Sequence, residues 1–160
     1  MSQNSRILQL HPIKAFVLFV ILDALCIGMG MGVPIFNIIL GFVVGWYLAR
    51  RITRVTHELK AILRRLLVYS CITACVTFLG MVLIWGWSIT ILRDPHADLA
   101  KFGMPMILYE PRASFIGWLL LMIVISPFLQ LLTTVFAGHL TLLSIYRKEK
   151  TSDISSQVTL

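Results

Sequence analysis

The chain has 160 residues, of which 58% are hydrophobic and 13% are charged. Soluble domains average roughly 45–50% apolar and about 25% charged residues, so this composition excludes an ordinary soluble protein and indicates a helical integral membrane protein. The formal net charge is +7. In a membrane protein such an excess first reports orientation, because Lys and Arg gather beside the cytoplasmic ends of spans, and we expect no nucleic-acid partner.

Residues 1–13 are expected to form a cytoplasmic N-terminal segment. Two apolar runs follow within residues 14–49, "AFVLFVILDALCIGMGMG" and "VPIFNIILGFVVGWYLA". A helix needs ~20 residues to cross ~30 Å of hydrocarbon, so the runs are long enough if they share the turn. We interpret them as a transmembrane helical hairpin, spans one and two. The glycines of "GMGMGVP" then form a bend, since their spacing is not the G-x-G-x-x-G of a dinucleotide site.

The next segment, residues 50–65, reads "RRITRVTHELKAILRR". Its apolar residues recur at helical spacing and basic residues fill other positions, which predicts a basic amphipathic helix that lies at a membrane surface or extends a span into the cytoplasm. Basic residues beside a membrane attract anionic lipid headgroups. The predicted lipid contacts are Arg50, Arg51, Arg54, Lys60, Arg64 and Arg65.

The rest of the chain predicts two more spans. Residues 66–92 form the third span, and residues 93–112 form an outer loop with a short helix between Asp94 and Gly103. Residues 113–146 form a fourth span, which is too long for one straight crossing and is expected to kink at Pro127. Residues 147–160 are polar and predict a disordered cytoplasmic tail.

Four spans place both termini and the basic segment on one side of the membrane. That side carries eleven of the fourteen Lys and Arg residues, so the positive-inside rule assigns it to the cytoplasm. The four Trp and four Tyr residues fall near predicted span ends, at headgroup level. The sequence therefore predicts an all-α, polytopic protein of the plasma membrane: a four-transmembrane-helix bundle with both termini cytoplasmic.

Asp23 is the most informative single residue. It lies nine positions after Lys14, about 14 Å along a helix, and a carboxylate at that depth costs about 2.5–3.5 kcal/mol unless it faces the bundle interior and finds a partner. Asn37, at a similar depth on the other arm of the hairpin, and His139 on the fourth span are the candidate partners. These intramembrane polar residues indicate either a proton or cation relay or a clamp that fixes helix register.

Small residues predict close helix packing. Gly41 and Gly45 form a GxxxG pair, Gly28 and Gly32 have the same spacing, and Gly80 ends a stripe of small residues on the third span. Such faces let helix backbones approach within a chain or between chains.

A soft-metal site is a third hypothesis. Two M-x-M pairs and one His are predicted on the outer side: Met29, Met31, His96, Met104 and Met106. Thioethers suit Cu(I), although methionine also serves as an adaptable gap-filler. Otherwise we expect no cofactor.

No Ser/His/Asp set, carboxylate pair or zinc motif occurs in the sequence, so we do not expect an enzyme. The leading hypothesis is a non-catalytic subunit or scaffold that assembles with other membrane subunits, or with itself, through small-residue faces. The alternative is a small transporter or proton/cation pathway centred on Asp23 and Asn37.

Overall fold

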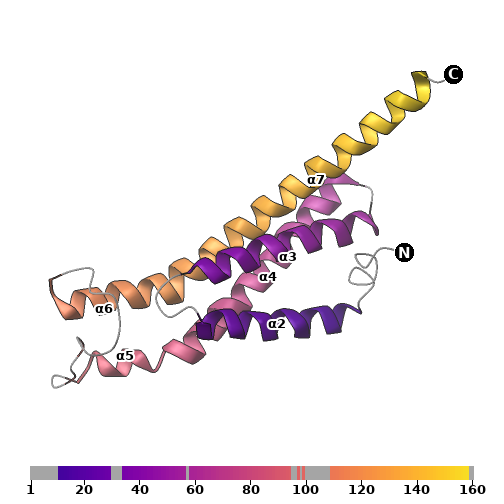
Figure 1. The fold of residues 1–160 in the computed structure, drawn as a ribbon. Helices are drawn as coiled ribbons and strands as arrows, with labels where there is room; N and C mark the ends of the chain where they lie inside the picture. Colours follow the sequence, from indigo (N-terminus) through magenta and orange to yellow (C-terminus); the bar gives the residue numbers. More distant parts are fainter. Residues whose placement is uncertain are drawn as a thin grey trace.

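A computed structural model of the chain describes residues 11–29, 34–56, 58–94, 97, 99 and 109–158. This part is helical and contains no strand (Figure 1). Four helical stretches are long and apolar enough to cross a membrane: α2 (Pro12–Met29), α3 (Ile35–Thr53), α4 (Leu59–Trp85) and the continuous stretch Pro111–Lys148. The predicted all-α bundle of four membrane-length helices is confirmed.

The last stretch passes through Pro127 without a break. It consists of α6 (Pro111–Leu120), the π-helical turn η2 (Leu121–Ile125) and α7 (Ser126–Val158). Proline has no N–H and its ring displaces the carbonyl one turn earlier, so the turn before Pro127 widens: the Ser126 N–H bonds to the Leu121 carbonyl five residues back. Helices bend at such turns, and the long helix changes direction between α6 and α7 (Figure 1).

The segment for which the sequence predicts a disordered tail belongs to helix α7 up to Val158. This part of α7 projects beyond the other helices (Figure 1). Polar composition alone predicted disorder, but neither Gly nor Pro follows Gly138 before residue 158. Nothing local therefore stops a helix that the apolar part of α7 has already nucleated.

The basic segment is divided between two helices. Helix α3 ends at Thr53, the N–H groups of Val55 and Thr56 both bond to the Ile52 carbonyl, and α4 begins at Leu59. The turn follows from tertiary packing: Ile52 before it and Ile62 after it are both buried in one cluster with Ala49, Leu66 and Leu142. A single straight helix could not bring both isoleucines to that cluster. We call this end of the bundle the basic end, because it carries Arg50, Arg51, Arg54, Lys60, Arg64 and Arg65.

The third span also differs in its bounds. Helix α4 starts seven residues before the predicted residue 66 and ends at Trp85, and a four-residue helix, α5 (Ser88–Ile91), follows. The N–H of Gly86 still bonds to the Val82 carbonyl, 2.8 Å away. Most of the predicted outer loop, including its short helix, lies outside the described residues.

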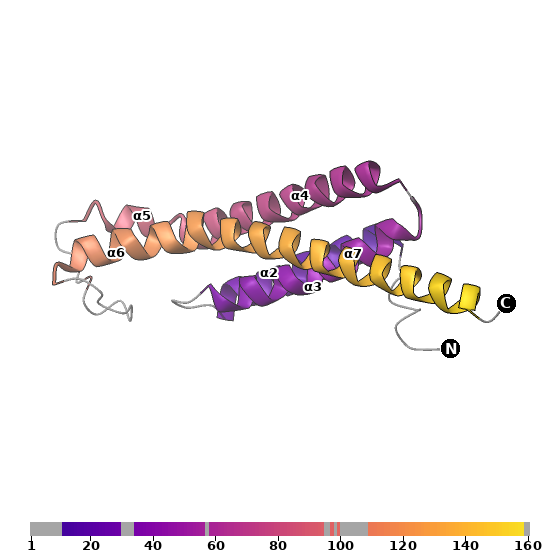
Figure 2. The same cartoon turned by 90° about the horizontal axis from the view of Figure 1, so that it is seen from above.

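Helices α3 and α7 form the centre of the bundle and run side by side in the same direction (Figures 1 and 2). A second apolar cluster at the opposite end joins Ile27 of α2 and Met81 of α4 to Phe115, Trp118 and Met122. There the rings of Trp85 and Trp118 meet edge to face, 5.0 Å apart. Helix α2 packs through one narrow stripe, since its buried residues are Phe19, Asp23 and Ile27.

Candidate functional site

Uncharged polar side chains and one carboxylate are buried between these helices, while large apolar side chains cover much of the outer surface. Because hydrocarbon cannot solvate polar groups, such residues turn inward and bond to one another. Five of them, from all four long helices, form what we call the polar cluster: Asp23, Asn37, Thr77, Ser126 and Gln130.

Asp23 lies at the interface of α2 with α4 and is only 2% exposed. It belongs to the single buried stripe of α2, one turn from Phe19 and one turn from Ile27. Its Oδ1 accepts a hydrogen bond of 2.8 Å from the Thr77 hydroxyl. Thr77, which bonds to this carboxylate, and Gln130, which lies beside it, are both neutral.

Thr77 has two acceptors within reach. Besides Asp23, its Oγ1 lies 3.1 Å from the Thr73 carbonyl oxygen, the preceding turn of the same helix. A hydroxyl has one proton to donate and lone pairs to accept with. Thr77 can therefore donate to an ionised Asp23, or donate to Thr73 and accept a hydrogen bond from a protonated Asp23.

Gln130 faces this pair from α7. It is fully buried, and its side-chain amide lies beside the Asp23 carboxylate. Neither its Nε2 nor its Oε1 makes a hydrogen bond of ordinary geometry with the described residues. An unpaired buried polar group costs about 1–3 kcal/mol, so this amide is available to an ion, a water molecule or a rearranged carboxylate.

Asn37 does not pair with Asp23 in this structure. Its Nδ2 donates to the Ser126 hydroxyl at 2.8 Å, and its Oδ1 is buried without a partner among the described residues. The reason is helical phase: Asn37, Gly41 and Gly45 are spaced by four residues, and both glycines lie against α7. Asn37 on the same stripe therefore faces α7 rather than α2.

His139 is not drawn into the cluster either. It is exposed, and its Nδ1 lies 2.8 Å from the Val135 carbonyl of its own helix. The neighbouring residues Ala137 and Gly138 lie on another face of α7, and that face is buried.

The structure gives the predicted packing glycines different neighbours. A Cβ on Gly41 would lie 2.8 Å from the Gln130 carbonyl oxygen, and one on Gly45 would lie 3.0 Å from Ala137 Cβ. Gly80 faces Ile27 of α2, at 2.9 Å, whereas among the described residues no other helix comes within 4 Å of such a Cβ on Gly28. Gly32 lies outside the described residues.

The predicted lipid-contacting residues divide into separate groups. The Arg50 guanidinium lies 4.8 Å from the Trp46 ring centroid, Arg51 donates to the Tyr47 hydroxyl at 2.6 Å, and Arg65 donates to the Thr56 hydroxyl at 2.9 Å. The remaining three predicted lipid-contacting residues, Arg54, Lys60 and Arg64, are exposed.

Met29 ends α2 with 59% of its surface exposed. The other residues of the copper hypothesis, Met31, His96, Met104 and Met106, lie outside the described residues. Within the described part, no three His, Cys, Asp or Glu side chains come together in a metal-binding group.

Sequence reasoning missed three members of the polar cluster. Thr77 belongs to the stripe of small residues that ends at Gly80, which predicts helix contact, although a hydroxyl one helix away from an intramembrane acid is also a donor. Gln130 and Ser126 were not singled out, yet a glutamine in the apolar run "SPFLQLL" is the kind of polar residue that turns inward in a membrane helix.

No protein-family model, curated protein or solved structure matches the chain.

Proposed function

We propose that the protein is a small membrane transporter or ion pathway in which Asp23 binds a proton or a small cation inside the bundle. The observation that carries the proposal is a buried carboxylate whose one hydrogen bond in the described part comes from a neutral hydroxyl, beside amide atoms of Gln130 and Asn37 that have no hydrogen-bond partner in that part. Ionisable residues within membrane helices are costly and commonly mark ion pathways.

The cluster has the chemistry that such a role needs. A carboxylate, a hydroxyl and amide oxygens are hard ligands that suit a proton or an alkali or alkaline-earth cation. Thr77 can serve Asp23 in either protonation state by turning between Asp23 and Thr73, which lie 2.8 and 3.1 Å from its hydroxyl oxygen. The Thr77 hydroxyl therefore has an acceptor for its proton both when Asp23 is ionised and when Asp23 is protonated.

The packing of the glycines argues against the scaffold hypothesis. That hypothesis relied on free small-residue faces, but Gly41 and Gly45 contact α7 and Gly80 contacts α2 within the same chain. These three glycines are thus used for internal packing.

Proton or cation flux in proteoliposomes tests the proposal. Wild-type protein should dissipate an imposed proton or alkali-cation gradient, and Asp23→Asn should abolish that flux because the amide carries no exchangeable charge. Asn37→Leu should reduce flux only partly, since Asn37 bonds to Ser126 rather than to the carboxylate. Equal flux in wild type and Asp23→Asn, in vesicles that retain equal amounts of folded protein, would reject the role of Asp23.

Helix α2 supports the alternative, a subunit of a larger membrane complex. Most of its apolar side chains are exposed, including Ile13, Val17, Ile21 and Leu25, and no other helix in the described part comes within 4 Å of the Cβ position of Gly28. A partner helix could pack closely there. Light scattering of the particle purified in mild detergent tests this, and a mass equal to one chain plus detergent argues against it.

We further propose a plasma-membrane location with the basic end in the cytoplasm. Support comes from the excess of Arg and Lys near the α3–α4 turn and at the end of α7. A reporter inserted between Val55 and Lys60 should be active on the inner side, and activity on the outer side would reverse the orientation.

A further inference from the structure

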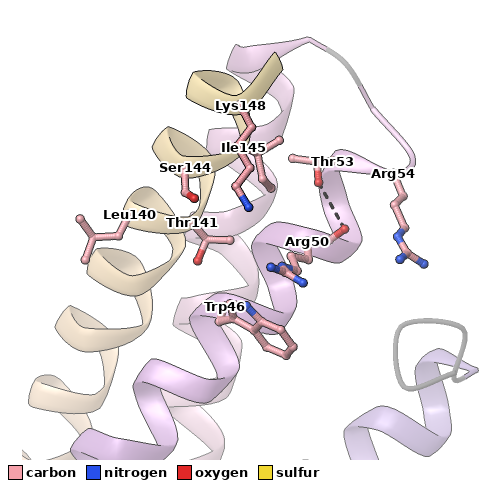
Figure 3. Close-up of a pocket in the computed structure, with 9 residues that line it drawn as sticks. All are labelled: Trp46, Arg50, Thr53, Arg54, Leu140, Thr141, Ser144, Ile145 and Lys148. Carbon is pink, nitrogen blue, oxygen red and sulfur yellow. Dashed lines mark hydrogen bonds between the residues drawn. The ribbon is translucent and has the colours of Figure 1, made fainter. Parts of the chain in front are cut away.

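A groove of about 430 Å³ lies at the basic end between α3 and α7. Helix α3 lines it with Trp46 and Arg50, Arg54 lines it just after the end of α3, and helix α7 lines it with Thr141, Ser144 and Lys148 (Figure 3). Its volume falls within the ~300–1,000 Å³ range of ligand sites. The groove is separate from the polar cluster, since none of the five residues of that cluster lines it.

The groove gathers positive charge from both helices. Arg50 and Lys148 extend from opposite helices into the same space, whereas Arg54 points away at the rim (Figure 3). None of the described residues that line it is acidic. Two cations facing one space repel each other, and a bound anion removes that repulsion.

The individual donors suit an oxyanion. The Arg50 guanidinium lies 4.8 Å from the centroid of the Trp46 ring, which holds its plane while leaving N–H groups for oxygen acceptors. The Ser144 hydroxyl has no hydrogen-bond partner among the described residues, whereas Thr141 already donates to the Ala137 carbonyl at 2.8 Å. Arginine, lysine and a free hydroxyl together match a phosphate group.

An apolar track continues the groove toward the middle of the bundle. One turn further from the basic end than Trp46 and Leu140, the rings of Phe42 and Phe136 meet edge to face, 6.2 Å apart, and are 42% and 55% exposed. Since α3 and α7 run in the same direction, both helices present apolar residues on this track and basic residues at its end. A lipid has the same order of apolar and polar parts.

We propose that this groove binds one anionic phospholipid, with its phosphate between Arg50, Lys148 and Ser144 and an acyl chain along Phe42 and Phe136. The ligand class is thus a phosphate-bearing lipid rather than a free anion, because the apolar track adjoins the basic pocket. The proposed site is more specific than a general attraction of lipid to the basic end. Arg51 is not part of it, because Arg51 bonds to Tyr47 and does not line the groove.

Native mass spectrometry of the purified protein tests the site, with phosphatidylglycerol, phosphatidylcholine and inorganic phosphate as probes. We expect saturable retention of phosphatidylglycerol over phosphatidylcholine, and no displacement by millimolar inorganic phosphate. In Arg50→Gln/Lys148→Gln the retention should fall about tenfold or more, because charge-assisted bonds to the phosphate are lost.

The matched control for each single substitution, Arg50→Gln or Lys148→Gln, is Arg51→Gln, which likewise removes one positive charge and should alter retention by less than about twofold, as a residue outside the groove. Lys148→Gln alone, at an exposed position, keeps the test informative if the double variant does not fold. Phe136→Ala should weaken lipid retention through loss of the acyl-chain contact.

Three results would overturn the proposal. An equal loss in Arg51→Gln would mean diffuse charge attraction, and equal retention of phosphatidylcholine would mean that the site does not select an anionic lipid. Displacement of phosphatidylglycerol by inorganic phosphate would identify a free anion as the ligand.

Discussion

Replacement of Gly45 by alanine should separate the two central helices. The added methyl would collide with the Thr134 carbonyl oxygen and would lie 3.0 Å from both Ala137 Cβ and the Gly138 nitrogen. Carbon atoms in contact prefer separations of about 3.5–4.0 Å, and the obstacle is largely backbone, which cannot rotate away. Helices α3 and α7 must therefore move apart along their closest line of contact.

The size of the effect follows from two opposing terms. Overpacking at a close contact costs about 1–3 kcal/mol, while alanine is favoured over glycine in a helix by up to about 1 kcal/mol. We expect Gly45→Ala to lower the free energy of unfolding by about 1–2 kcal/mol after both terms. Unfolding with SDS in mixed micelles, followed by circular dichroism, measures the change.

Gly28→Ala is the matched control. Gly28 is also helical, but no atom of another described helix lies within 4 Å of the position its Cβ would take. The substitution should leave stability unchanged or raise it by about 0.5–1 kcal/mol. If Gly45→Ala is as stable as Gly28→Ala, the close α3–α7 contact is not present in the folded protein.

Two further predictions concern the polar cluster and the membrane-facing surface. Thr77→Val removes the donor to Asp23 at nearly constant volume and should lower the free energy of unfolding by about 0.6–1.7 kcal/mol. Thr77→Ser keeps the hydroxyl and should retain most of the wild-type stability. The same SDS titration measures both variants, and equal stability of the two would contradict the described bond. Cys71 and Cys75 are exposed on α4. They should resist a charged maleimide in intact membranes but react in SDS, because a charged reagent does not reach thiols that face lipid. Labelling in intact membranes, detected by mass spectrometry, would place that face of α4 in water.

Composition and periodicity were sufficient for the class of fold. A run of apolar residues long enough to cross a bilayer must satisfy its backbone internally, so "AFVLFVILDALCIG" can hardly be other than a helix in a membrane. The four such runs appear as four helices of membrane length. Pro127 likewise predicted a local distortion, and the π-helical turn Leu121–Ile125 lies directly before it, because a missing N–H acts on its own helix.

Helix ends were harder to predict. The turn between Thr53 and Leu59 contains neither Gly nor Pro, and its position follows from the joint burial of Ile52 and Ile62. The end of α7 shows the opposite case, since a polar sequence that predicted disorder continues a helix begun in the apolar part.

The sequence by itself determined the environment of this chain and the presence of a costly acid within it, because the transfer of apolar and charged groups between water and hydrocarbon depends on residue type alone. Only the tertiary structure decided which groups meet that acid. Asp23 bonds to Thr77 and Asn37 bonds to Ser126, since the rotation of each helix about its axis is set by contacts such as those of Gly41 and Gly45 with α7. Spacing along one helix fixes which residues share a face, but the neighbour that this face meets depends on the packing of all four.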